Sequence, residues 1–134
     1  MSKIAIFLAN GFEEIEGLTV VDICRRCGLT IDMVSITEDR QVMGSHKIPV
    51  TADMTLSQVD FTQYDCLVLP GGGLGTKNLE ACEPLMQQSM LFTQQENTSR
   101  QSVRHRAYSG TEASYREKEP APIPALKTIW KARQ

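Results

Sequence analysis

A short apolar run near the start of the chain most constrains its fold. Lys3–Ala9 is apolar after its first residue, which is typical of a parallel strand buried on both faces. A turn at Asn10–Phe12 follows. Glu13–Cys27 then has a helical pattern, with acidic residues in its first turn and arginines in its last, as suits the helix dipole. Gly28 stands where a left-handed cap would end that helix.

The same alternation continues to Gln88. Strands that alternate with helices predict an α/β fold with a doubly wound parallel sheet. In such sheets the chemistry lies at the carboxyl ends of the strands, where both a turn at Asn10–Glu16 and a glycine-rich loop at Pro70–Gly75 are expected. The further expected elements are strands at Thr30–Ile36 and Tyr64–Leu69, a short extra strand at Ile48–Thr51, a helical or turn segment at Ser57–Asp60 and a helix at Thr76–Gln88.

From Ser89 the periodicity fails. The following residues are polar and charged, and the alternating prolines Pro120, Pro122 and Pro124 exclude a regular helix there. Few apolar residues remain to offset the entropy of ordering, so we expect a disordered tail. We therefore divide the chain into a domain part, residues 1–88, and a tail, residues 89–134. A sheet of only three or four strands would keep an open edge and an uncovered face.

Composition excludes several classes of function. The net charge is -2, with 41% hydrophobic and 22% charged residues, so nothing favours binding to nucleic acid or to an anionic membrane. No apolar run approaches the roughly 20 residues of a membrane span. The start of the chain lacks the longer apolar stretch and the cleavage site of a signal peptide. We expect a cytoplasmic protein.

The cysteines offer a possible alternative chemistry. Cys24 and Cys27 form a C-x-x-C, which can indicate redox activity or half of a zinc site. No second C-x-x-C follows, and His46 and His105 stand far apart, so we expect no metal site. Both cysteines fall on one face of the predicted helix, which favours two buried core residues. Cys66 is likewise expected to be buried in a strand.

Two motifs carry the candidate chemistry: FLANGFEEIE at Phe7–Glu16 and DCLVLPGGGLGTKNL at Asp65–Leu79. In residue type, order and spacing they resemble the ThiJ/PfpI family, in particular its glyoxalase III and protein deglycase branch. Val21–Ile23 and the two arginines that follow fit the family's first helix. The resemblance covers Lys3 to about Gln88. It implies a flavodoxin-like fold of the class I glutamine amidotransferase type, here truncated.

The resemblance also implies roles for three residues. Glu16 matches the family's carboxylic acid, which hydrogen-bonds the reactive cysteine and serves as general acid and base. Gly71 and Gly72 match the loop whose backbone N–H groups face the developing oxyanion. Without the resemblance, Glu16 would be taken for a solvated first-turn residue. A nucleotide-binding loop at Gly71–Gly73 is disfavoured, because Thr76 stands where that fingerprint has Gly or Ala.

The family's nucleophile is missing. In the family a cysteine occupies a sharp strand-to-helix turn, in a context such as Ala-Ile-Cys-Ala-Ala-Pro-Ser, shortly after the helix that we expect to end near Gln88. No cysteine follows Cys82, which lies in the helix after the glycine loop. The chain as written therefore lacks covalent chemistry, and neither a cofactor nor a metal is implied.

A shifted reading frame after about Gln88 would explain this loss. In the neighbouring reading frame, the last base of each codon from Arg100 to Lys118 and the first two bases of the following codon form a new codon. Synonymous codons then permit Ala-(Ile/Val)-Cys-Ala-(Ala/Pro)-Pro-Ser, the cysteine elbow of the family. Glu119–Leu126 can likewise spell a family-like Cys-Ser-Tyr-Pro-Ser-Phe run. The alternative is a natural, divergent tail on a truncated domain.

Three hypotheses on function follow from the resemblance. The first is cofactor-free, cysteine-based processing of reactive carbonyls such as methylglyoxal, or of glycated proteins, for the gene from which this chain derives. The second is a non-catalytic redox sensor or chaperone. The third, which we favour for this exact chain, is a non-functional product. The family is typically homodimeric, and whether this chain dimerises stays open.

Overall fold

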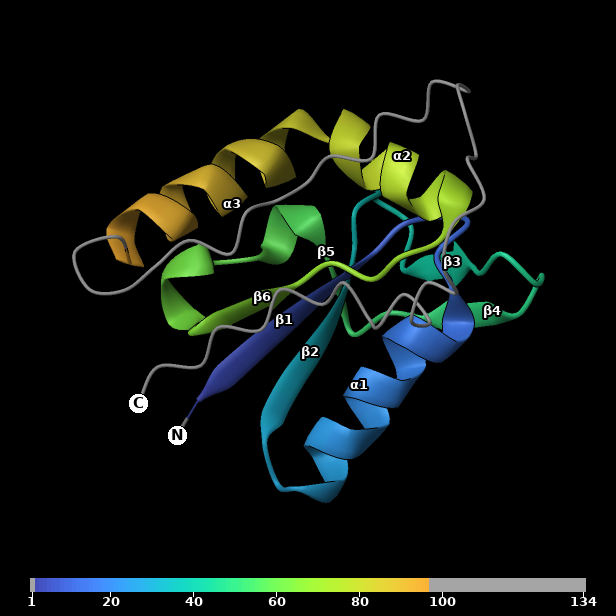
Figure 1. Ribbon diagram of the computed structural model, residues 1–134, viewed down its shortest axis with the longest axis horizontal. Coiled ribbons are helices and arrows are strands. Elements are labelled where there is room, and N and C mark those ends of the chain that lie inside the picture. The colour runs from blue at the N-terminus through green and yellow to red at the C-terminus, as the bar shows by residue number, and fades with distance from the viewer. Residues whose placement is uncertain (1, 97–134) are drawn as a thin grey trace, which may run out of the picture.

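The computed structural model describes residues 2–96 and contains a parallel sheet between helices (Figure 1). The sheet has the strand order β5-β2-β1-β6. A separate antiparallel hairpin, β3 with β4, lies beside it. The strands are β1 (Lys3–Leu8), β2 (Thr30–Ser35), β3 (Gln41–Met43), β4 (Pro49–Thr51), β5 (Met54–Thr55) and β6 (Cys66–Val68). The helices are α1 (Glu14–Arg26), α2 (Gly73–Ala81), α3 (Glu83–Glu96) and two 3₁₀ turns, η1 (Leu56–Gln58) and η2 (Phe61–Gln63).

Strand β1 is the centre of the sheet. It pairs in parallel with β2 on one side and with β6 on the other, so that Ile4 lies opposite both Ile31 and Cys66. Every residue from Ile4 to Leu8 is buried. This is the reason for the uninterrupted apolar run in the sequence, since a strand covered on both faces has no polar side. The predicted parallel α/β fold is confirmed.

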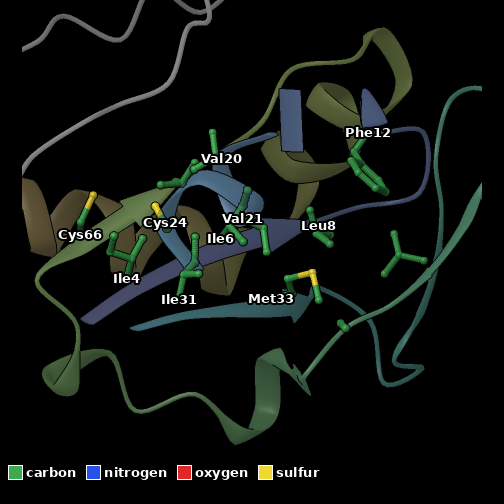
Figure 2. Packing of buried hydrophobic residues seen from close by; sticks show 13 residues of the cluster. Ile4, Ile6, Leu8, Phe12, Val20, Val21, Cys24, Ile31, Met33 and Cys66 are labelled. Carbon is green, nitrogen blue, oxygen red and sulfur yellow. The ribbon is translucent and has the colours of Figure 1, made fainter. Parts of the chain in front are cut away.

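Alternate residues of β1 feed two hydrophobic cores. Ile4, Ile6 and Leu8 belong to the first core, on the α1 face of the sheet. Ala5, Phe7 and Ala9 belong to the second core, on the α2 and α3 face. Figure 2 shows the first core, in which α1 packs its buried side against the sheet. The α1 members of that core are Val20, Val21 and Cys24.

The region after the glycine loop differs from the prediction. Instead of one helix from Thr76 to Gln88, the chain forms α2 and α3, which are separated at Cys82 by a residue with ψ 86. Pro84 fits the first turn of α3, where its missing N–H would have no partner in any case. The helix also continues past Gln88 to Glu96. Our prediction that regular structure ends at Ser89 is therefore wrong.

The outer side of α3 explains why its pattern was missed. Met90 and Leu91 are exposed, so apolar residues do not repeat on one face only. Ser89 and Thr93 turn their hydroxyls onto carbonyls of the preceding turn instead of breaking the helix. The predicted disordered tail, beyond Glu96, lies outside the described residues.

The remaining elements agree with the sequence in part. Cys24 and Cys66 are buried as expected, whereas Cys27 is exposed because it forms the C-cap of α1. The extra strand at Ile48–Thr51 exists as β4, but its partner β3 was not predicted. The expected segment at Ser57–Asp60 corresponds to the 3₁₀ turn η1. Among residues 2–96, no helix is long and apolar enough to cross a membrane.

Candidate functional site

Two loops meet at the carboxyl ends of β1 and β6, where the sequence placed the chemistry (Figure 1). The loop between β1 and α1 and the glycine loop between β6 and α2 are joined by backbone hydrogen bonds. Glu13 N–H donates to Gly71 O at 2.8 Å, and Gly75 N–H donates to Gly11 O at 3.0 Å. The Asn78 side chain adds a bond to a carbonyl of the first loop. The two family motifs thus meet at the carboxyl ends of β1 and β6.

Glu16 and Gly71 are in direct contact. The Gly71 N–H donates to Oε2 of Glu16 at 2.6 Å, across 55 residues of sequence. Glu16 is half-buried on the first turn of α1. A Cβ at position 71 would lie 2.1 Å from that same oxygen, so only glycine allows the carboxylate to approach the backbone. The structure therefore brings two of the three predicted site residues together.

Gly72 has a backbone conformation that residues other than glycine rarely adopt. Its φ is 119°, and a Cβ would meet Glu13 N and Gly11 O at 2.6 Å. Its carbonyl accepts a hydrogen bond from Thr76 N–H, which starts α2. Within residues 2–96 no hydrogen bond satisfies the Gly72 N–H, whereas that of Gly71 is bonded to Glu16. Sequence reasoning, which treated the two amides alike, did not foresee this difference.

The four cysteines lie outside the site formed by Glu16, Gly71 and Gly72. Cys24 and Cys66 belong to the first core, and Cys27 and Cys82 are the C-caps of α1 and α2. Burial, with the charge of Cys27 beside it, raises the pKa of the Cys24 thiol, which disfavours the reactive thiolate. None of these positions lies in the glycine loop, which carries Gly71 and Gly72, or in the first turn of α1, which carries Glu16.

A second polar group at the same edge was missed by the sequence analysis. Glu13, Glu14 and His46 converge, and we call them the Glu–Glu–His cluster. His46 Nδ1 lies 3.0 Å from Oε2 of Glu14 and 3.4 Å from Oε1 of Glu13. The Ser45 hydroxyl lies within hydrogen-bond distance of both carboxylates, 3.1 Å from Oε2 of Glu13 and 3.0 Å from Oε2 of Glu14. In the sequence analysis, His46 is compared only with His105, whereas its partner Glu14 lies 32 residues earlier in the chain.

The charges of the cluster depend on one another. Burial of the Glu14 carboxyl opposes its ionisation, but hydrogen bonds from the His46 side chain, from backbone N–H groups and from Ser45 outweigh this and lower the pKa to about 2. The pKa of His46 is raised in turn, chiefly by its hydrogen bond to Glu14 and then by the charge of Glu13. The cluster thus pairs a firmly ionised, 5% exposed carboxylate with a titratable imidazole.

Part of this sequence is similar to the sequences of other proteins. The chain is 37% identical over 95 residues to a "Glutathione-independent glyoxalase DJ-1" of Schizosaccharomyces pombe, covering 66% of this chain and 49% of the relative. It is 34% identical over 83 residues to "Protein DJ-1 homolog B" of Arabidopsis thaliana, covering 62% of this chain and 19% of the relative. The chain therefore spans half or less of the length of these relatives.

Solved structures agree. A DJ-1 superfamily protein from Salmonella typhimurium superposes with a TM-score of 0.68 at 37% identity, over 71% of this chain and 51% of that one. The Schizosaccharomyces pombe DJ-1 gives a TM-score of 0.63 at 31% identity, over 67% and 51%. A model of the DJ-1/PfpI family matches residues 2–100, which extends beyond the boundary expected near Gln88. This chain belongs to the DJ-1/PfpI family.

Proposed function

We propose that this chain carries the acid–base and oxyanion parts of a site that acts on small reactive carbonyls such as methylglyoxal. The observation that carries the proposal is the 2.6 Å hydrogen bond from Gly71 N–H to Glu16 Oε2, which joins the two family motifs beyond the carboxyl ends of β1 and β6. The similarity to a protein named as a glutathione-independent glyoxalase supports the choice of substrate class.

In the proposed reaction, a thiolate adds to the aldehyde carbon and Glu16 moves protons to and from the adduct. The Gly71 amide orients the Glu16 carboxylate by its hydrogen bond. The Gly72 N–H, which has no partner within residues 2–96, is the candidate donor to the oxyanion that develops on the carbonyl oxygen. No cofactor is required by this scheme.

The thiolate is the part that this chain does not supply. Its cysteines occupy core and helix-cap positions, outside the two loops of the site. We therefore propose that the 134-residue product is inactive as a carbonyl-processing enzyme, and that a shifted reading frame removed the cysteine elbow. Because α3 continues to Glu96 and the family match ends at residue 100, the shift lies nearer to Arg100 than to Gln88.

The first experiment reads the coding DNA from Gln88 to the stop codon. A neighbouring frame that encodes the cysteine elbow supports the proposal, and its absence overturns the frame shift. A protein with one base repaired should convert methylglyoxal to lactate, whereas the 134-residue chain should not. Glu16→Gln in the repaired protein should abolish turnover. Glu80→Gln, an exposed glutamate on α2, is the matched control.

The repaired protein also separates the competing functions. If it protects against oxidation but does not consume methylglyoxal, the redox-sensing alternative is favoured and the carbonyl proposal fails. If Glu16→Gln leaves turnover unchanged, the acid–base role of Glu16 is wrong even where the repaired protein is active.

A further inference from the structure

The Glu–Glu–His cluster is built by two segments that are distant in the sequence. Glu13 is the N-cap of α1 and Glu14 is its first residue, while His46 lies in the turn between β3 and β4. Their donor atoms, two carboxylate oxygens and one imidazole nitrogen, all lie within 4.8 Å of one another. The proposed carbonyl chemistry assigns no role to any of the three.

Backbone contacts hold the two segments together. Ser45 N–H donates to Phe12 O at 2.8 Å, and Gly11 N–H donates to Met43 O at 2.8 Å. His46 N–H donates to Oε1 of Glu14 at 2.7 Å, which fixes that carboxylate and leaves its Oε2 toward the imidazole. The geometry of the three donors is thus set by the fold before any ligand arrives.

The turn is shaped to admit the carboxylate. A Cβ at Gly44 would lie 2.1 Å from Oε1 of Glu14, so the side chain of Glu14 fills the space that a larger residue would need. Lys47, which follows His46, has a φ of 62° and so adopts the left-handed conformation that tightens the turn. The buried position of Glu14 is therefore a built feature of the hairpin.

The charges favour a cation. Two carboxylates face one imidazole, and the ion pairs within residues 2–96 include no lysine or arginine on either glutamate. Side-chain exposure rises from 6% at Glu14 through 28% at Glu13 to 68% at His46. The cluster is closed on the protein side and open to solvent on the other, as a metal site with an exchangeable position requires.

We propose that Glu13, Glu14 and His46 bind a divalent transition-metal ion of the zinc class. Bonds of about 2.0–2.1 Å around a tetrahedral zinc ion place neighbouring ligand atoms about 3.3 Å apart. The distances from His46 Nδ1 to the two carboxylate oxygens, 3.0 and 3.4 Å, bracket that spacing. The imidazole ligand favours zinc over magnesium or calcium, which prefer oxygen alone. The Ser45 hydroxyl would then donate to a ligating carboxylate.

Calorimetric titration of the metal-free 134-residue chain with Zn²⁺ tests this proposal. We expect one zinc per chain, with affinity reduced at least about tenfold in His46→Ala. The matched control is His105→Ala, the other histidine of the chain, which should bind zinc as the parent does. A Cys27→Ser, Cys82→Ser double variant controls for binding at the more accessible thiols.

Several outcomes overturn the proposal. No zinc binding by the parent does so, as does binding that survives His46→Ala or is lost in the cysteine double variant. Glu14 is buried, so its variants are liable to misfold, and the exposed His46 is tested first, with circular dichroism to confirm the fold. As a second readout, Co²⁺ bound to the cluster should lack the intense thiolate charge-transfer band. None of these measurements depends on carbonyl turnover.

Discussion

The two faces of the sheet are closed to different degrees. Among residues 2–96, the first core holds thirteen buried residues with three partly buried ones against it, whereas the second holds eight buried and eight partly buried residues. The first face is covered by α1, which directly follows β1, and by the neighbouring hairpin. The second depends on η2, α2 and α3, which come much later in the chain. Within residues 2–96, local strand–helix–strand packing thus buries most of the first core, whereas half of the apolar residues of the second core are only partly buried.

The largest expected effect on the free energy of unfolding comes from a comparison of two phenylalanines, one from each face. Phe12 is fully buried in the first core, and Phe92 is partly buried against the second. Phe12→Ala should lower the free energy of unfolding by about 3–5 kcal/mol, the usual loss for a buried phenylalanine. Phe92→Ala should cost about half as much or less. Urea denaturation followed by circular dichroism measures both, and equal losses would show that the two faces are equally closed.

A pair of adjacent glycines tests how firmly the glycine loop lies against the α1 side. Gly72→Ala should destabilise the chain by about 2–3 kcal/mol, because its Cβ would collide with backbone atoms at a positive φ. Gly73→Ala is the control, since its Cβ would meet nothing within 4 Å at the start of α2. That change should be neutral or stabilise by about 0.5–1 kcal/mol. Comparable losses in thermal denaturation would contradict the contacts described for Gly72.

On the second face, Tyr64 supplies a smaller, polar contribution. Its O–H donates to Asp32 at 2.7 Å, so Tyr64→Phe should cost about 1 kcal/mol. Burial, and then the hydrogen bond and charge of Asp32, raise the pKa of Tyr64 above its usual value of 10.0. Its contribution is therefore present below pH 10 and is lost as the pH rises above that value. The stability advantage of the parent over Tyr64→Phe should therefore shrink as the pH rises above 10, and parallel curves would exclude this role.

The smallest effect is expected at the exposed end of the Glu–Glu–His cluster. The pKa of His46 is raised above 6.5 by Glu14 and Glu13, so its charged form stabilises the fold below pH 6.5. That contribution is lost as the pH rises through the raised pKa. Melting temperatures with a chelator present should differ between parent and His46→Ala at pH 5.5 and converge at pH 9. A constant difference would mean that the imidazole acts by packing alone.

The sequence predicted the features that depend on local pattern. The apolar run of β1 predicted a central parallel strand, and the charge order of Glu13–Cys27 predicted α1 to within a residue. The two family motifs identified Glu16 and Gly71, which lie in contact. Their roles in catalysis stay predictions.

What the sequence did not predict depends on contacts between distant segments. β3 and β4 are three residues long, and their pairing brings His46 to Glu14, a contact that no local spacing reveals. The extension of α3 was missed because Met90 and Leu91 face outward and its other residues are mostly polar. Cys27 was assigned to the core because residues i and i+3 share a face inside a helix, whereas Cys27 is the C-cap that follows the last helical residue, Arg26.

The four cysteines differ in burial, so their reactivity can report on local unfolding of each face of the sheet. Cys24 and Cys66 are sealed in the first core, Cys82 is half-covered beside the second, and Cys27 is exposed. A thiol reagent should therefore modify Cys27 at once, Cys82 when the second face opens, and the other two only when the first face does. The rates of modification, read by mass spectrometry on the parent chain, would rank the opening free energies of the two faces.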